Sequence, residues 1–319
     1  MRSPTNAERG YKTATRIILR AMRARLFRAA CFLACSLSTG TALAQQQHRL
    51  TWHSDWRRVG GIEYAVTTGM FATFVGVWFL PPAEEPIWTE PVLFDTATRD
   101  ALRLHTRHGR NIAGSVSDGV ALVSYLPPLI IDPLIVAGFG DRNPDVAWQL
   151  FIISMQSYSI TFVLNAVSKR VLARERPYAR PCLKDPDYSS SCQHHDRFRS
   201  FYSGHAAITA TSAGLICAQH THVPLYGPPE QPDGSGGEID RGVCIAAVAG
   251  MLTTATLRIV ADKHWASDVI VGTFLGLSVG YLLPTLVYFK SFESKPDQAE
   301  NQIAITRQPL PLMTYAGTF

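Results

Sequence analysis

The stretch ASDVIVGTFLGLSVGYLLPTLVYF, residues 266–289, contains one charged side chain, Asp268, in an otherwise apolar run. A run of this length and composition is typical of a helix that crosses a lipid bilayer. Gly272, Gly276 and Gly280 recur at every fourth position and therefore lie along one face of that helix. Small residues in this pattern let two helices approach closely. We therefore expect a spanning helix whose glycine face packs against a neighbouring helix.

Other apolar segments of helical length precede this one, at 61–80, 113–138, 146–168, 204–218 and 242–260. No segment alternates apolar and polar residues as a half-buried strand does. The fold class predicted is therefore all-α, a six-helix bundle embedded in a membrane, with its active site at one end.

Two segments carry features that modify this pattern. Asp118, Pro127-Pro128 and Asp132-Pro133 interrupt segment 113–138, so we expect that helix to be kinked or broken. Asp132 must then be either buried against a partner or near a polar end. Residues 94–104 place apolar side chains at helical spacing, which predicts a short amphipathic surface helix that Asp95 can cap.

The N-terminal region resembles an export signal. Residues 22–44, MRARLFRAACFLACSLSTGTALA, join a basic start to a short apolar core and a small-residue cleavage site after Ala44. An uncleaved anchor is the alternative, and residues 1–21 are a possible extra N-terminus. The domain organisation predicted is a signal-like segment at 1–44, an N-terminal helix with an amphipathic linker at 45–111, a core at 112–289 and a C-terminal tail at 290–319.

The cysteines fall into three pairs. Cys31 and Cys35 would leave with the signal, and Cys217 and Cys244 lie in apolar helical segments where we expect packed small hydrophobic side chains. Cys182 and Cys192 flank the polar loop CLKDPDYSSSC, and an exported chain favours a disulfide there. Two free loop thiols are the alternative for that pair.

Charge indicates a local anion site. The formal net charge is +5, and basic residues concentrate around 169–199 instead of spreading over a face. This clustering excludes nucleic-acid binding as the main interpretation and favours a bound phosphate.

Polar residues fall at consistent ends of the predicted helices, in three groups: Lys169 with Arg176, then Ser203-Gly204-His205, then Arg258 with His264 and Asp268. Alternating helix directions bring these groups to the same end of the bundle. Like charges gathered there repel each other unless an anion pairs with them. A helix N-terminus at Ser203-Gly204 also favours an anion, because its free N–H groups and dipole point there. Together the groups predict a phosphate-binding active site.

These residues resemble, in order and spacing, the three-part signature of the type 2 phosphatidic acid phosphatase and vanadium haloperoxidase superfamily, over roughly residues 112–288. Two positions depart from that signature: Tyr202 stands where the family usually has proline, and Leu257 where it usually has serine. Neither position holds the transferred group.

The resemblance implies phosphoryl transfer through a covalent phosphohistidine, with no metal and no other cofactor. His264 would be the nucleophile, Asp268 would support its other ring nitrogen, and His205 would be the general acid and then the base. The non-bridging phosphate oxygens would be bound by the remaining signature residues, Lys169, Arg176, Ser203, Gly204 and Arg258.

The expected substrate is a lipid phosphate or diphosphate, such as phosphatidate, phosphatidylglycerophosphate or undecaprenyl diphosphate. The alternatives are a soluble periplasmic acid phosphatase, a vanadate-dependent haloperoxidase, and a non-enzymatic membrane protein with a relict pocket.

We expect the protein to lie in the inner membrane of a bacterial-type cell envelope, with the active site facing the periplasm. Six spans after a cleaved signal would instead place that end in the cytoplasm. This conflict requires a retained signal, a segment 113–138 that does not cross, or a soluble periplasmic protein.

Overall fold

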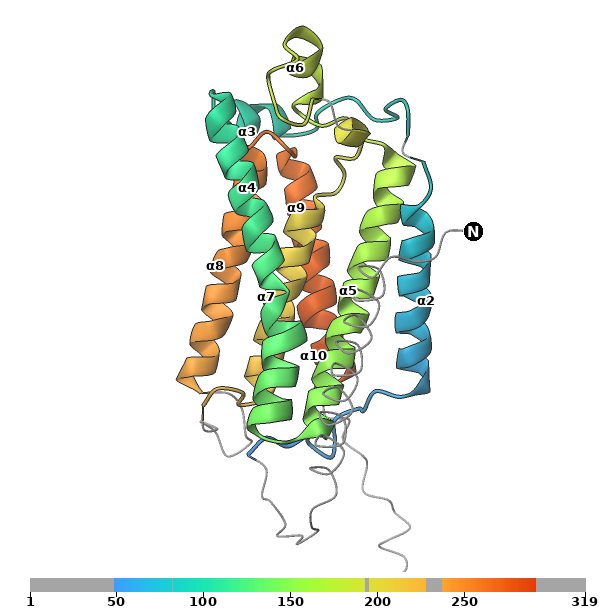
Figure 1. Ribbon diagram of the computed structural model, residues 1–319, viewed down its shortest axis with the longest axis vertical. Helices are drawn as coiled ribbons and strands as arrows, with labels where there is room; N and C mark the ends of the chain where they lie inside the picture. The colour runs from blue at the N-terminus through green and yellow to red at the C-terminus, as the bar shows by residue number, and fades with distance from the viewer. Residues whose placement is uncertain (1–48, 82, 193–194, 228–236, 291–319) are drawn as a thin grey trace, which may run out of the picture. The chain divides into compact units, whose positions relative to one another are not determined.

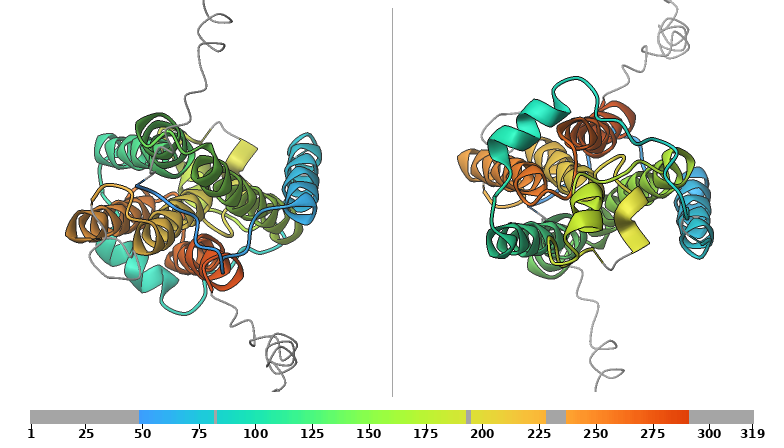
Figure 2. Two further views of the ribbon diagram at one scale, coloured as in Figure 1. Left: turned by 90° about the horizontal axis from the view of Figure 1, so that it is seen from below. Right: turned by 90° about the horizontal axis from the view of Figure 1, so that it is seen from above.

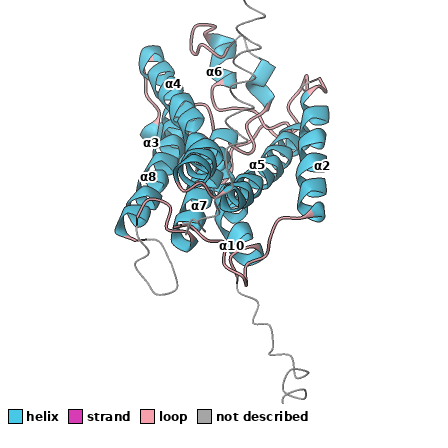
Figure 3. Cartoon of the chain, turned by 60° about the horizontal axis from the view of Figure 1, so that its bottom comes forward, coloured by secondary structure: helices cyan, strands magenta, loops and turns pink. Residues whose placement is uncertain are grey.

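A computed structural model describes residues 49–81, 83–192, 195–227 and 237–290. The signal-like segment at 1–44, Cys31, Cys35 and nearly all of the tail lie outside these residues. Within the described ranges the chain is helical and has no strand, and Trp88 and Arg174 form an isolated bridge (Figure 3). The predicted all-α class is confirmed.

Within the described residues, six long helical rods run side by side (Figure 1). They are α2 (Gly61–Trp78), α4 (Arg107–Ser124) continued by the π-helical segment η1 (Pro127–Gly140), α5 (Pro144–Leu172), α7 (Gly204–His222), α8 (Glu238–Val260), and α9 (Ala266–Leu277) continued by η3 (Ser278–Leu282) and α10 (Leu283–Val287). The short α3 (Asp95–Leu102), α6 (Ala179–Lys184) and 3-10 turn η2 (His195–Phe198) lie at one end of the bundle, at the top of Figure 1. The predicted six-helix bundle is confirmed.

Helix α7 is the central helix of the bundle. It contacts α4, α5, α8 and α9, as the views along the helices in Figure 2 illustrate. Gly276 on α9 and Gly280 on η3 allow this rod to pack closely against α7. A Cβ at these positions would lie 2.3 Å from the Ala207 carbonyl oxygen and 2.2 Å from the Thr211 carbonyl oxygen. The predicted glycine packing seam is confirmed.

Four helical segments in the described residues are long and apolar enough to cross a membrane: Arg107–Gly140, Pro144–Leu172, Glu238–Val260 and Ala266–Val287. Their outer faces expose large apolar side chains, for example Leu122, Ile245 and Phe274, and this surface supports membrane localisation. The predicted spans at 61–80 and 204–218 form α2 and α7 but do not reach the same apolar character. For α7 the reason is its central position, since a helix enclosed by other helices need not be apolar.

The interrupted segment 113–138 is not broken, because it forms part of one continuous helical segment. It lies in one helical rod from Arg107 to Gly140, whose second part takes up the prolines in π-helical geometry. Asp132 is fully buried, accepts a hydrogen bond from the Tyr226 hydroxyl at 2.5 Å and lies 3.4 Å from His220 Nε2. Of the two environments expected for Asp132, the buried one with a partner is correct.

Two disulfides connect the described cysteines. The one predicted between Cys182 and Cys192 is present, with the Cα atoms 5.5 Å apart, and closes the loop that follows α6. A second disulfide joins Cys217 on α7 to Cys244 on α8. The expectation that these two residues are packed thiols is therefore wrong, because the close approach of α7 and α8 brings their Cα atoms to 4.7 Å.

Candidate active site

A polar pocket of about 460 Å³ lies at the end of the bundle that carries α3 and α6. It contains Lys169, Arg176, His205 and Arg258 from the predicted set. The other lining residues were not predicted as site residues: Trp78, Asp118, Tyr178, Ser191, Asp196, Arg199 and Lys263. The predicted convergence of the basic groups at one end of the bundle is therefore present in the structure.

Lys169 and Arg176 reach the pocket from different kinds of backbone. Lys169 lies in the last turn of α5, which ends at Leu172 because Ala173 takes the left-handed conformation (φ 35°). Arg176 follows in an extended segment outside the helix, where its Nε donates to the Asp196 carbonyl oxygen at 2.9 Å. Lys169 and Arg176 therefore do not share one helix, although both line the same pocket.

His264 is buried in the turn between α8 and α9, with 2 % of its surface exposed. A guanidinium N–H of Arg176 donates to His264 Nε2 at 3.2 Å, so this nitrogen carries the lone pair and Nδ1 carries the proton. Burial lowers the pKa of His264 well below its usual value, and Arg176 and Arg258 lower it further. The imidazole is therefore neutral near pH 7, which is the form that can act as a nucleophile.

Asp268 stands beside His264 without forming a hydrogen bond to it. Its Oδ2 lies 3.6 Å from His264 Nδ1, which has no hydrogen-bond partner among the described residues. Asp268 is the third residue of α9 and accepts the Trp265 N–H at 3.0 Å, so this capping contact, and not a shared helix face, brings it near the histidine.

Arg174 holds Asp268 in place, although it is not one of the motif residues. Its guanidinium donates to Asp268 at 2.5 Å and to Asp95 at 2.6 Å, and all three side chains are fully buried. The Ser200 hydroxyl donates to the other Asp268 oxygen at 2.5 Å. Asp95, expected only to cap a surface helix, thus joins α3 to the supporting network of the proposed nucleophile. In the sequence, only its charge and its position two residues before Arg176 mark Arg174 as a candidate.

His205, Asp118 and Arg258 form a second cluster across the pocket. His205 Nε2 lies 3.0 Å from Asp118 Oδ1, and the Arg258 guanidinium donates to the same oxygen at 2.7 Å. Arg258 also donates to the Ser117 hydroxyl at 3.0 Å. Asp118 was expected only as an interruption of an apolar segment, yet it orients the predicted general acid.

Ser203 and Gly204 form the N-terminus of α7. The Ser203 hydroxyl accepts the Ala206 N–H at 3.4 Å and caps the helix. A Cβ at Gly204 would lie 2.8 Å from Asn165 Oδ1 and 3.2 Å from Lys169 Nζ, so only glycine lets the lysine approach this helix end. A cation and free backbone N–H groups therefore meet at one point, as an anion site requires.

No group of three or more His, Cys, Asp or Glu side chains that could hold a metal ion occurs among the residues that the structure describes. The polar pocket combines lysine and arginine side chains with His205, a set suited to an oxyanion.

Residues 147–292 match the family model of the PAP2 superfamily, and every predicted site residue from Lys169 to Asp268 lies within the match. The match confirms the resemblance seen in the sequence. It supports an enzyme of the phosphatase class.

The chain is similar to a solved structure described as the first transmembrane PAP2 type phosphatidylglycerolphosphate phosphatase from Bacillus subtilis. The two share 17 % sequence identity, the similarity covers 70 % of this chain and 94 % of that one, and the TM-score is 0.44. No curated protein matches the chain.

Proposed function

We propose that this protein is a membrane phosphatase that hydrolyses a lipid phosphate or lipid diphosphate through a phosphohistidine on His264. The observation that carries the proposal is the neutral, buried His264, whose Nε2 lies 3.2 Å from an Arg176 nitrogen, beside a pocket rich in cations. A phosphoryl group bound by Arg176 would place its phosphorus close to that lone pair.

In the first step, the lone pair of His264 Nε2 attacks phosphorus and the bond from phosphorus to the leaving oxygen breaks. Protonated His205 gives its Nε2 proton to that oxygen, and Asp118 balances the charge of the imidazolium beforehand. Lys169, Arg176 and Arg258 stabilise the charge on the non-bridging oxygens.

The phosphohistidine formed on Nε2 is cationic at the ring and keeps its proton on Nδ1. Asp268, at 3.6 Å, lies where its carboxylate can close on that proton and stabilise the intermediate. In the second step a water molecule attacks phosphorus, His205 takes a proton from the water, and the bond from phosphorus to His264 Nε2 breaks. Inorganic phosphate leaves and the neutral His264 is restored.

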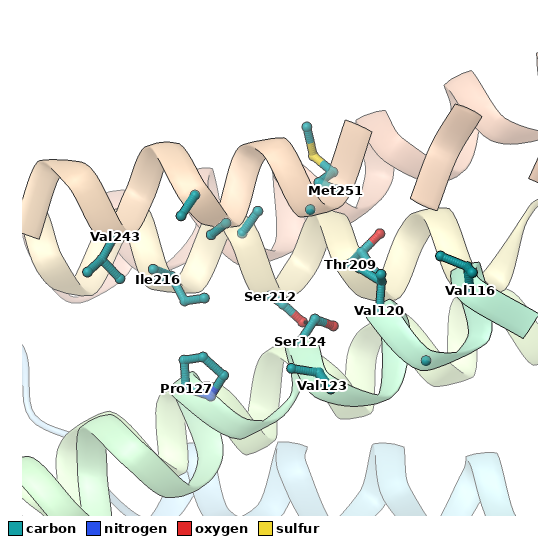
Figure 4. Close-up of a pocket in the computed structure, with 15 residues that line it drawn as sticks. Val116, Val120, Val123, Ser124, Pro127, Thr209, Ser212, Ile216, Val243 and Met251 are labelled. Carbon is teal, nitrogen blue, oxygen red and sulfur yellow. Dashed lines mark hydrogen bonds between the residues drawn. The ribbon is translucent and has the colours of Figure 1, made fainter. Parts of the chain in front are cut away.

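An apolar cavity of about 500 Å³ supports a lipid substrate (Figure 4). It lies between α4, α7 and α8, with Val120 on the α4 side, Thr209 on the α7 side and Met251 on the α8 side. Its hydroxyl groups are satisfied internally, since Ser212 donates to the Ile208 carbonyl oxygen at 3.0 Å.

The cavity begins beside the polar pocket. Val116 on α4 is two residues from Asp118, and Thr209 on α7 is one turn from His205 and donates to its carbonyl oxygen at 2.9 Å. A hydrocarbon chain in this cavity would be continuous with a phosphate in the polar pocket. This arrangement favours a lipid over a soluble ester.

We place the protein in the inner membrane with its active end toward the periplasm. The Cys182–Cys192 loop at that end is the support, because disulfides persist on the oxidising side of a membrane. Reaction of an introduced cysteine in this loop with a membrane-impermeant thiol reagent in intact cells would agree, and reaction only after lysis would contradict the orientation.

The function is tested by phosphate release from the protein in detergent micelles. The panel contains phosphatidate, phosphatidylglycerophosphate, a prenyl diphosphate and a soluble aryl phosphate, each with and without EDTA. We expect release from the lipids at a kcat/KM well above that of the soluble ester, and no effect of EDTA. Preference for the soluble ester would favour the acid phosphatase alternative, and loss with EDTA would contradict a metal-free mechanism.

A further inference from the structure

Lys263 is a basic residue of the polar pocket that stands outside the motif residues. It precedes His264 in the turn between α8 and α9, and its side chain lines the pocket with Tyr178 and Ser191. Its Nζ donates to the Ser191 hydroxyl and lies 5.3 Å from the centroid of the Tyr178 ring. No carboxylate forms an ion pair with this ammonium within the described part of the chain, so its charge remains available to a ligand.

The side chain of Lys263 points toward α4. Its Cε lies 3.6 Å from the position that a Cβ on Gly114 would take. Asp118 follows Gly114 by one helical turn on the same face, and it contacts His205 Nε2 at 3.0 Å. The ammonium therefore lies on the side of the pocket that holds the proposed general acid, where the leaving group departs.

The charge of the pocket exceeds what one phosphate needs. Five basic side chains line it, against the carboxylates of Asp118 and Asp196. A phosphate monoester carries about −1.5 to −2 charges at pH 7. A second phosphate on the leaving side would use the remaining positive charge.

The position of Lys263 is fixed by its neighbours. Asp262 before it has φ 58°, is fully buried, and accepts from Arg99 at 2.6 Å and from the Tyr188 hydroxyl at 2.8 Å. Tyr188 and Ser191 both belong to the loop that the Cys182–Cys192 disulfide closes. A cation held this firmly is suited to a defined contact instead of a diffuse attraction.

We propose that Lys263 binds the non-transferred phosphate of a lipid diphosphate and thereby makes diphosphates the preferred substrates of the site. The inference rests on the proposed phosphatase function and names its substrate class. His264 takes the terminal phosphoryl group, the bond from its phosphorus to the bridging oxygen breaks, and His205 protonates that oxygen. The leaving group is the lipid monophosphate, whose charge Lys263 offsets without losing its own proton.

The test measures kcat/KM for a prenyl diphosphate and for the prenyl monophosphate with the same tail, both in the same detergent. We expect Lys263→Met to lower the value for the diphosphate by roughly 10- to 100-fold, the range for a lost hydrogen bond to a charged group, and the value for the monophosphate by less than about threefold. Lys263→Arg, which keeps the charge, should retain most of the preference.

Lys184→Met is the matched control, because Lys184 is exposed on α6 and lies outside the pocket. It should leave both values unchanged, and the thermal midpoint of each variant shows whether it folds. Equal losses on both lipids, or no loss on the diphosphate, would overturn the assignment of Lys263 while leaving the phosphatase function intact. Absence of phosphate release from either lipid by the unaltered protein would overturn the proposed function, and this inference with it.

Discussion

Two buried histidines at opposite ends of the bundle have opposite surroundings. His220 lies in the last turn of α7, with Nδ1 2.7 Å from Asp240 and Nε2 3.4 Å from Asp132. His264 lies at the end where α7 begins, with a guanidinium on Nε2 and no hydrogen bond on Nδ1. Carboxylates flank both ring nitrogens of His220, whereas His264 has a guanidinium at Nε2 and a single carboxylate, Asp268, 3.6 Å from Nδ1.

The difference distinguishes a structural histidine from the proposed nucleophile. Both ring nitrogens of His220 have carboxylate partners, so its interactions hold η1, α7 and the start of α8 together. His264 has a neutral ring beside a pocket, and its Nε2 lone pair accepts a hydrogen bond from Arg176 at 3.2 Å. The surrounding charges, and not the residue type or the degree of burial, therefore distinguish the proposed nucleophile from His220.

The largest effect expected is on catalysis at His264. Replacement by alanine removes the nucleophile, so phosphate release should fall by roughly 10⁴-fold or more. The thermal midpoint should stay close to that of the unaltered protein, since the only hydrogen bond of the His264 ring among the described residues is the one that it accepts from Arg176. Release measured on the best lipid of the panel checks this, and retained activity would contradict the covalent mechanism.

Replacement of His220 by alanine should have the reverse outcome. Asp132 and Asp240 would remain buried without their partner, which lowers the free energy of unfolding by about 3–5 kcal/mol. Thermal unfolding in detergent should show the loss, while phosphate release per folded molecule should stay within about threefold. A fall in activity with unchanged stability would show that the distinction between the two histidines is incorrect.

Arg174 extends the comparison to residues that support His264 without touching substrate. Arg174→Met leaves Asp268 and Asp95 without their buried cation, and we expect kcat to fall by roughly 10- to 100-fold at a nearly constant KM. Arg174→Lys should restore part of kcat, because it returns a positive charge. An effect confined to KM would show that Arg174 contributes to binding and not to positioning.

How much of the fold and of the candidate site could be predicted from the sequence depends on the kind of interaction. The glycine spacing of residues 266–289 and the order of apolar segments were sufficient for the six-helix bundle, because burial in helices follows sequence periodicity. The motif spacing likewise placed Lys169, His205 and Arg258 around one pocket. Roles in catalysis remain predictions.

The missed features depend on long-range contacts. Asp95 meets Arg174 across 79 positions of the chain, and Asp118 meets Arg258 across 140. The disulfide between Cys217 and Cys244 depends on how closely α7 and α8 pack. Local patterns cannot indicate such partners, since each residue alone resembles a helix cap, an interruption or a packed thiol.

The smallest effect expected is a pH dependence of substrate preference at Lys263. Burial lowers the pKa of Lys263 to about 8, with further contributions from Arg176 and Arg258. The ammonium is therefore charged below about pH 8 and loses its charge as the pH rises through that value. The ratio of kcat/KM for the prenyl diphosphate to that for the monophosphate should fall by up to about tenfold between pH 7 and pH 9, because kcat/KM reports ionisation in the free enzyme. Lys263→Arg should keep the ratio constant, since arginine stays protonated over this range. The same decline in that variant would assign the pH dependence to another group, such as the substrate phosphates.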